Sequence, residues 1–261
     1  MAETQIKFDD GAAYERMMGA WSRIAGATFL DWLAPATGKQ WADIGCGNGA
    51  FTELIMQRCA PAQVKGIDPS EGQLAFARTR DGARGAEFAQ GDAMALPLPD
   101  KSFDLATMAL VLFFVPEPKR GIAEMMRVVR PGGTIAAYVW DLPGGGFPLD
   151  TVWVAMRVAG MRVPLPVSAS LSNMAALEQS FVDSGLDAIE TKAIDAERTF
   201  VSFEEFWDVV LLSPGVGPTI KAMPARDHDA LKANVRQGLK AGSGKVTATG
   251  KANAIKARVR V

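Results

Sequence analysis

The sequence predicts an α/β protein in which helices cover a doubly wound, seven-stranded, mostly parallel sheet that carries a helical cap. Two observations support this fold class. Between positions 41 and 140, short apolar runs alternate with helical patterns of about ten residues, as they do in βαβ units. The first apolar run ends in a glycine-rich loop, at the place where the carboxyl edge of such a sheet binds its ligands.

The predicted elements follow the spacing of the apolar residues. From Tyr14 to Leu33 this spacing is helical and stops at Ala34-Pro35, which predicts an N-terminal amphipathic helix. Strands are expected at residues 41–45, 64–68, 86–91, 103–110, 134–140, 186–194 and 252–259. Helices are expected at residues 50–58, 71–79, 119–129, 152–161, 174–184, 203–212 and 226–239. Glycines and prolines from Pro143 to Pro148 interrupt the sheet pattern, so the cap should begin there.

Composition and charge describe an ordinary globular chain. Of 261 residues, 48% are hydrophobic and 22% are charged, which is enough apolar material for one large core with insertions. The 28 Lys and Arg nearly balance the 29 Asp and Glu. No global field therefore draws the protein toward nucleic acid or an anionic membrane, and its partners must be argued locally.

The cysteines and the apolar runs bear on location. Cys46 and Cys59 are the only cysteines, so neither a disulfide scaffold nor a thiolate metal cage is expected. The opening stretch MAETQIKFDDGAAYE lacks the apolar core of a signal peptide. The longest strongly apolar run, Leu105 to Val115, is about half of the roughly 20 residues that span a bilayer. We expect a cytoplasmic protein with no metal and no membrane span.

The stretch WADIGCGNGAF, residues 41–51, carries the strongest local signal. Gly45, Gly47 and Gly49 lie between a predicted strand and a predicted helix. Gly45 and Gly47 with Ala50 also satisfy the dinucleotide fingerprint, in which glycines let the backbone approach a pyrophosphate. The ligand could be a dinucleotide or a cationic molecule, and Asp43 distinguishes the two. Its carboxylate would repel a pyrophosphate but attract an ammonium and a sulfonium. S-adenosylmethionine carries both cations.

Several motifs together resemble the class I S-adenosylmethionine-dependent methyltransferases. D-I-G-C-G-N-G is similar to motif I, and Asp68, which closes the strand VKGID, matches the acid that binds both ribose hydroxyls. Gly91-Asp92-Ala93 follows the third strand, where the residues that contact the adenine lie in this family. The stretch DKSFDLATMALVLFFVPEP resembles the fourth strand and its turn, and MRVVRPGG resembles the turn before the fifth strand. These motifs occur in the family's order and spacing.

The resemblance is strongest to the ubiquinone and menaquinone methyltransferases and related small-molecule enzymes of methyltransferase type 11, and it extends from Tyr14 to Asp141. Beyond it, WDLPGGGFPLDTVW and ATGKANAIKARV resemble a bacterial branch of the superfamily. One departure is Phe113, where members often carry His or Asn. The resemblance implies a Rossmann-like sheet divided into a lid (residues 1–36), an S-adenosylmethionine-binding core (37–142) and the rest of the sheet with substrate-cap insertions (143–261).

The resemblance also implies the residues of the cofactor site, which extend from the lid to the fourth strand. They are Tyr14, Asp43, Gly45, Cys46, Gly47, Asp68, Pro69, Gln73, Asp92, Ala93 and the backbone near Met108. Trp140 and Asp141, at the end of the fifth strand, and Phe113 are the candidate substrate contacts.

The expected reaction is an in-line methyl transfer to oxygen, nitrogen or carbon of a small molecule. Its rate can come largely from orientation in a dry site, so a general base is optional. No acid–base pair stands out, and the catalytic residues stay unknown. His228, the only histidine, lies in a polar helix start and is expected to be solvated.

Two other functions stay open at this point. A non-catalytic S-adenosylmethionine-binding protein would also lack a base, and a NAD-type oxidoreductase would share the sheet. From Thr219 onward there are ten Lys or Arg and two acids. No aromatic residue interleaves them, so we expect a solvated cap surface and no nucleic-acid partner. The oligomeric state is open.

Overall fold

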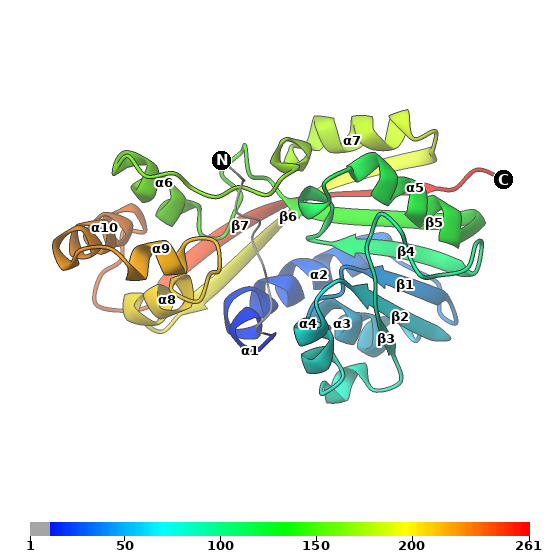
Figure 1. The fold of residues 1–261 in the computed structure, drawn as a ribbon, viewed down its shortest axis with the longest axis horizontal. Helices are drawn as coiled ribbons and strands as arrows, with labels where there is room; N and C mark the ends of the chain where they lie inside the picture. Colours follow the sequence, from blue (N-terminus) through cyan, green and yellow to red (C-terminus); the bar gives the residue numbers. More distant parts are fainter. Residues whose placement is uncertain (1–10) are drawn as a thin grey trace.

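The computed structural model describes residues 11–261, and the first ten residues of the predicted lid lie outside them. It contains the predicted seven-stranded sheet, with the order β3-β2-β1-β4-β5-β7-β6 (Figure 1). Only β7 is antiparallel to its neighbours. The strands are β1 (Gln40–Ile44), β2 (Gln63–Asp68), β3 (Glu87–Gln90), β4 (Phe103–Ala109), β5 (Val129–Trp140), β6 (Asp187–Phe200) and β7 (Val246–Arg258). This confirms the doubly wound, mostly parallel sheet.

Helices cover both faces of the sheet. Tyr138 of β5 contacts Phe29 of the N-terminal helix, with ring centroids 4.9 Å apart. Met108, whose sheet partner Ala137 precedes Tyr138 and so points to the other face, lies against Gly121 of α5. The helices are α1 (Gly11–Tyr14), η1 (Glu15–Gly19), α2 (Ala20–Leu33), α3 (Ala50–Cys59), α4 (Glu71–Ala77), η2 (Asp81–Ala83), η3 (Leu112–Phe114), α5 (Pro118–Val128), α6 (Asp150–Val158), η4 (Ala169–Ser172), α7 (Met174–Asp183), α8 (Phe203–Val210), α9 (Gly217–Lys221) and α10 (Ala225–Gly238).

The predicted N-terminal helix is continuous but irregular. Its first turns, α1, lead into a π-helical segment, η1, before the regular helix α2 begins at Ala20. The helix ends where predicted, because Ala34 adopts a left-handed conformation just before Pro35. π-helical turns inside α-helices occur frequently at functional sites.

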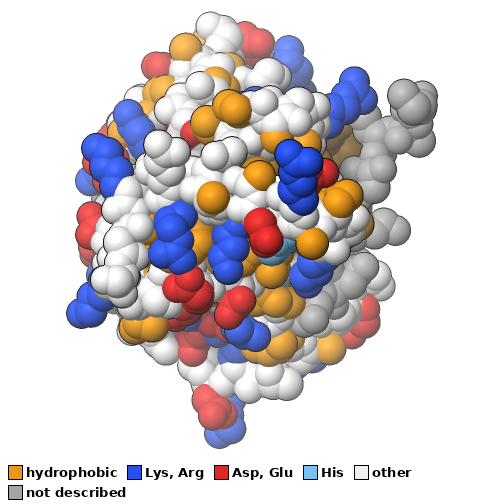
Figure 2. Space-filling model, turned by 90° about the vertical axis from the view of Figure 1, so that its left-hand side faces the viewer, with side chains coloured by type: hydrophobic (Ala, Val, Ile, Leu, Met, Phe, Trp, Pro, Cys, Tyr) orange, Lys and Arg blue, Asp and Glu red, His pale blue; other side chains and the backbone are white. Residues whose placement is uncertain are grey.

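The last two strands are longer than predicted. β5 ends at Trp140, opposite Ala252 of β7, so residues 195–200 and 246–251 continue as a two-stranded ribbon beyond the carboxyl edge of the sheet. The cap helices α8, α9 and α10 connect the two strands at the end of this ribbon, and α6 lies beside them (Figure 1). Figure 2 looks onto this end of the molecule, where basic and acidic side chains are interspersed. The division of the chain at residues 36 and 142 stays a prediction.

None of the helices within residues 11–261 combines the length and the apolar character that a membrane crossing requires.

Candidate functional site

The glycine-rich loop follows β1 and rests on β2. Ile67 accepts hydrogen bonds from the backbone N–H groups of Gly45 (2.6 Å) and Cys46 (3.1 Å). Gly45 has a φ of +70°, and a methyl group on its Cα would clash with Val111, so this position requires glycine. Gly47 has a φ of +53°, but a methyl group there would meet only the Gln73 Oε1, at 3.9 Å. The backbone at Gly47 is therefore open on the side of Gln73.

Asp68, the last residue of β2, holds the loop in place. Its Oδ2 accepts a hydrogen bond from the Gly47 N–H at 2.8 Å, and its Oδ1 accepts one from the Ser70 N–H at 2.9 Å. Burial raises the pKa of this carboxyl, although the two N–H groups oppose the shift. Each carboxylate oxygen can accept a further hydrogen bond, so Asp68 retains capacity for two ligand hydroxyls.

Asp43 is fully buried near the carboxyl end of β1. Its Oδ2 accepts a hydrogen bond from the Thr52 hydroxyl at 2.6 Å, but its Oδ1 has no partner among residues 11–261. Burial, reinforced by the charge of Asp68 and opposed by the Thr52 hydrogen bond, raises the pKa of Asp43 to about 7. A buried carboxylate is costly unless it is paired, so this site favours a positively charged ligand.

Gln73, in the first turn of α4, is a second buried group without partners. Its side chain is 2% exposed, and neither amide atom has a hydrogen-bond partner among the described residues. Because its Oε1 lies next to Gly47, the amide faces the open side of the loop. A buried amide normally makes hydrogen bonds, and a ligand with both a donor and an acceptor would supply them here.

The lid helix is attached to the glycine-rich loop by side chains that the sequence analysis missed. Glu15 of η1 accepts a hydrogen bond from the Asn48 side chain at 2.8 Å and forms ion pairs with Arg80 and Arg23. Arg80 also donates to the Asn48 carbonyl, at 2.6 Å. Of these residues, only Asn48 belongs to the glycine-rich stretch, so it was the one indication in the sequence of this attachment. These contacts hold the first turns of the lid over the loop.

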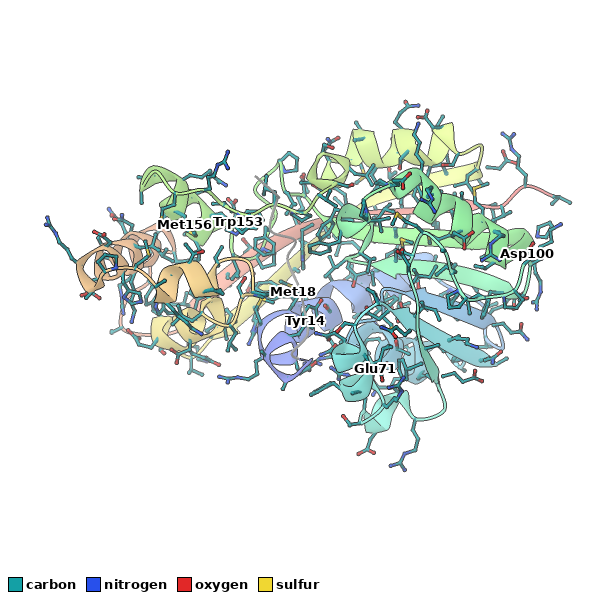
Figure 3. All side chains as sticks on the ribbon, viewed as in Figure 1. Tyr14, Met18, Glu71, Asp100, Trp153 and Met156 are labelled. Carbon is teal, nitrogen blue, oxygen red and sulfur yellow. The ribbon has the colours of Figure 1, made fainter. Side chains whose placement is uncertain are left out.

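Tyr14 lies between the loop and an apolar cavity. Burial raises the pKa of its hydroxyl to about 12, against a hydrogen bond with Ser22 that lowers it, and the charge of Asp68 also raises it. Tyr14 directly precedes Glu15, which hydrogen-bonds to Asn48 of the loop, and it also lines the cavity, so this end of the lid borders both. Figure 3 shows Tyr14 and Met18 on the lid helix, between the sheet and the cap, with Trp153 on the cap side.

The cavity lies between the lid, the sheet and the cap and is partly open to solvent. Aromatic, aliphatic and thioether side chains dominate its wall, and Ser213 and Tyr14 supply the hydroxyls. The lining residues are Tyr14, Met17, Met18, Leu110, Phe113, Phe114, Trp140, Leu142, Phe147, Trp153, Pro164, Pro166, Ser213, Pro214, Gly215 and Val216. Of the predicted substrate contacts, Trp140 and Phe113 line the cavity and Asp141 does not. Asp141 instead accepts a hydrogen bond from the Gly144 N–H, within the turn that follows β5.

Three further predicted residues, Pro69, Asp92 and Ala93, follow the ends of β2 and β3. Pro69 is exposed between β2 and α4, and its carbonyl accepts a hydrogen bond from Gln90 at 2.9 Å. Asp92 follows β3, is exposed, and accepts a hydrogen bond from the Met94 N–H, with Ala93 between them.

The last three residues considered in the sequence, Cys46, Met108 and His228, pack against other parts of the protein. Cys46 is buried in the loop, and burial raises the pKa of its thiol well above the usual range. Met108 is buried one residue beyond the β1–β4 pairing. His228 packs against Trp207 in the cap, with ring centroids 5.6 Å apart, and does not line the cavity.

Comparison with known proteins assigns the central part of the chain. Residues 42–137 match the family model described as methyltransferase domain. The chain is 35% identical over 114 residues to a fatty-acid O-methyltransferase of Mycolicibacterium smegmatis, covering 42% of each chain. It is 32% identical over 156 residues to a demethylmenaquinone methyltransferase of Renibacterium salmoninarum, covering 60% of this chain and 61% of that one. The chain thus spans about half the length of the curated relatives it matches.

A solved structure extends the similarity of the fold to the whole chain. An S-adenosylmethionine-dependent methyltransferase from Thermotoga maritima has a TM-score of 0.56 with 18% identity, and the alignment covers 95% of each chain. At this identity the similarity concerns the fold alone.

Proposed function

We propose that the chain is a class I S-adenosylmethionine-dependent methyltransferase that transfers a methyl group to a small apolar acceptor, as the match to the methyltransferase domain and the relatives support. The observation that carries this proposal is the juxtaposition of two sites. A loop flanked by buried polar atoms that have no partner among the described residues lies beside an apolar cavity, and the lid segment with Tyr14 and Glu15 borders both.

The residues around the loop fit S-adenosylmethionine. Asp68 would accept hydrogen bonds from the two ribose hydroxyls, and Asp43 would balance the positive charge of the methionine part. The unpartnered amide of Gln73 would hydrogen-bond to the nucleoside, and Asp92 with Ala93 would contact the adenine. When bound, the cofactor supplies an electrophilic methyl group on a sulfonium. The protein supplies orientation and a dry environment, which in well-oriented systems lower a barrier by up to about 7–11 kcal/mol.

The titratable groups that line the cavity limit the chemical class of the acceptor. Tyr14 is the one titratable side chain among the described lining residues, and with a pKa of about 12 it is neutral at neutral pH and cannot act as a general base. The acceptor must therefore arrive as a nucleophile. A carboxylate, an acidic hydroxyl or a stabilised carbanion on an apolar body meets this requirement, whereas an ammonium does not.

Turnover tests the proposal directly. The purified protein would be incubated with S-adenosylmethionine and a set of apolar carboxylic acids, phenols and enols, and the release of S-adenosylhomocysteine and the methylated product would be measured. We expect turnover with at least one of these classes and none with simple aliphatic amines. Cofactor binding without turnover on any acceptor would support the alternative of a non-catalytic binding protein.

The buried Asp43 predicts a pH dependence. An acid with a raised pKa in the fold favours folding below the pKa of the unfolded chain, and this contribution is lost as the pH rises toward the folded value. The ligand-free protein should therefore lose stability between about pH 4 and pH 7. Asp43→Asn should flatten this slope in thermal unfolding. The same variant should bind S-adenosylmethionine more weakly, because the amide offers no charge to the cation. An unchanged slope in Asp43→Asn would show that Asp43 is not the titrating group.

Location and macromolecular partners are further parts of the proposal. Both cysteines are free and buried, which supports a reducing compartment such as the cytoplasm. Acidic side chains interspersed among the basic ones at the cap end support a solvated surface and no nucleic-acid partner (Figure 2).

A further inference from the structure

Exposed apolar side chains gather on one segment of the cap. Among residues 11–261, the large hydrophobic residues with high exposure are seven, and four of them lie between positions 154 and 167. We call these four the rim: Val154, Val158, Leu165 and Val167. Val158 is 77% exposed and Leu165 54%. Several exposed apolar residues along one segment indicate an interaction surface more strongly than single scattered ones do.

The rim borders the acceptor cavity. Val154 follows the lining residue Trp153, and Leu165 lies between the lining residues Pro164 and Pro166. The same short segment thus presents one set of side chains to the cavity and the other set to solvent. An apolar molecule moving between the outside and the cavity along this segment would stay in contact with apolar groups.

The segment is held in place from its inner side. Val154 and Val158 share the outer face of α6, and Trp153, from the inner side, stacks on Phe147 with ring centroids 4.3 Å apart. After α6, the Ser168 N–H donates to the Phe113 carbonyl at 3.0 Å, and its hydroxyl donates to the Val115 carbonyl at 2.8 Å. The exposure of the rim therefore belongs to a segment that is anchored at both ends.

The charged residues within the rim segment are arginines. Residues 151–177 contain Arg157 and Arg162 and no acid. Asp150, just before them, pairs with Arg157 at 3.5 Å, which leaves Arg162 exposed beside the rim. A methyl group on Gly238 would lie 2.7 Å from the Thr151 side chain, so the end of α10 abuts the start of α6. Apolar side chains beside exposed arginine occur in interfacial membrane segments, where the guanidinium meets anionic headgroups.

We infer that the rim docks on the surface of an anionic lipid bilayer. An apolar acceptor dissolved in the bilayer would then reach the cavity without crossing water. The route of the acceptor rests on the proposed function, but the docking does not, since it needs neither cofactor nor turnover.

Binding to vesicles tests the inference. The full chain would be mixed with vesicles of phosphatidylcholine alone or with phosphatidylglycerol added, and the bound fraction would be measured by flotation. We expect binding to the vesicles with phosphatidylglycerol, weaker at high salt, and at least tenfold weaker binding of the double variant V158D/L165D. The double variant V182D/V201D, which adds the same charges at exposed valines outside the rim, should bind like the unmodified protein.

Three results would overturn the inference. They are no binding to phosphatidylglycerol vesicles, equal binding to both vesicle types, and equal loss of binding in the two double variants. Binding of the rim to an acidic carrier protein without vesicle binding would also contradict it. Thermal unfolding of both double variants checks that the core is folded without relying on the cofactor, and calorimetry with S-adenosylhomocysteine tests the proposed function separately, so the two failures are distinguished.

Discussion

Gly47→Ala is expected to weaken S-adenosylmethionine binding by at least tenfold. Its loss of folding stability should not exceed the cost of placing alanine in a left-handed conformation. Gly47 has a φ of +53°, and a methyl group there would extend into open space beside Gln73. In the proposed complex this space is filled, because the loop backbone must approach the cofactor closely. The left-handed conformation itself costs a non-glycine residue about 1–2 kcal/mol. Calorimetry would give the affinity, and thermal unfolding of the ligand-free protein would give the stability.

Gly38→Ala is the matched control. Gly38 has a φ of +72°, and a methyl group there meets nothing within 4 Å, so the variant carries the same kind of backbone strain away from the loop. We expect the two variants to lose similar stability and only Gly47→Ala to lose affinity. Equal affinities in the two variants would mean that the cofactor does not lie against Gly47.

Asp68→Ala is expected to raise the dissociation constant of S-adenosylmethionine at least tenfold, which corresponds to about 1.4 kcal/mol. The substitution removes the acceptor for two ribose hydroxyls and releases the N–H groups of Gly47 and Ser70, which now bind the carboxylate. Asp68→Asn keeps one acceptor oxygen and should show an intermediate loss. Calorimetric titration of the two variants beside the unmodified protein measures this order, and an unchanged affinity in Asp68→Ala would refute the assignment.

The sequence was sufficient for the core of the sheet because its signals are local. Central parallel strands are apolar on both faces, so β1 and β2 stand out as short apolar runs between helical patterns. The glycine-rich loop could be predicted from the sequence because its backbone geometry requires glycine. Asp43 and Asp68 were predicted from their places at the strand ends, and the structure brings both to the loop.

The cap was less predictable because its pattern depends on distant partners. In the ribbon, buried Ala196 and Phe200 of β6 flank the partly buried Arg198, which weakens the alternation that marks a strand. The contact between Glu15 and Asn48 joins residues 33 positions apart, and neither residue signals the other in sequence. The cavity lining from Pro164, Pro166 and residues 213–216 likewise comes together only through folding of the cap.

The central claim is that the loop binds a cationic methyl donor and not a dinucleotide. Titration calorimetry of the unmodified protein with S-adenosylmethionine, and separately with NAD, tests it most directly. We predict saturable one-to-one binding of S-adenosylmethionine and no detectable heat with NAD, because the buried Asp43 favours positive charge and opposes a pyrophosphate. Binding of NAD with no binding of S-adenosylmethionine would contradict the account.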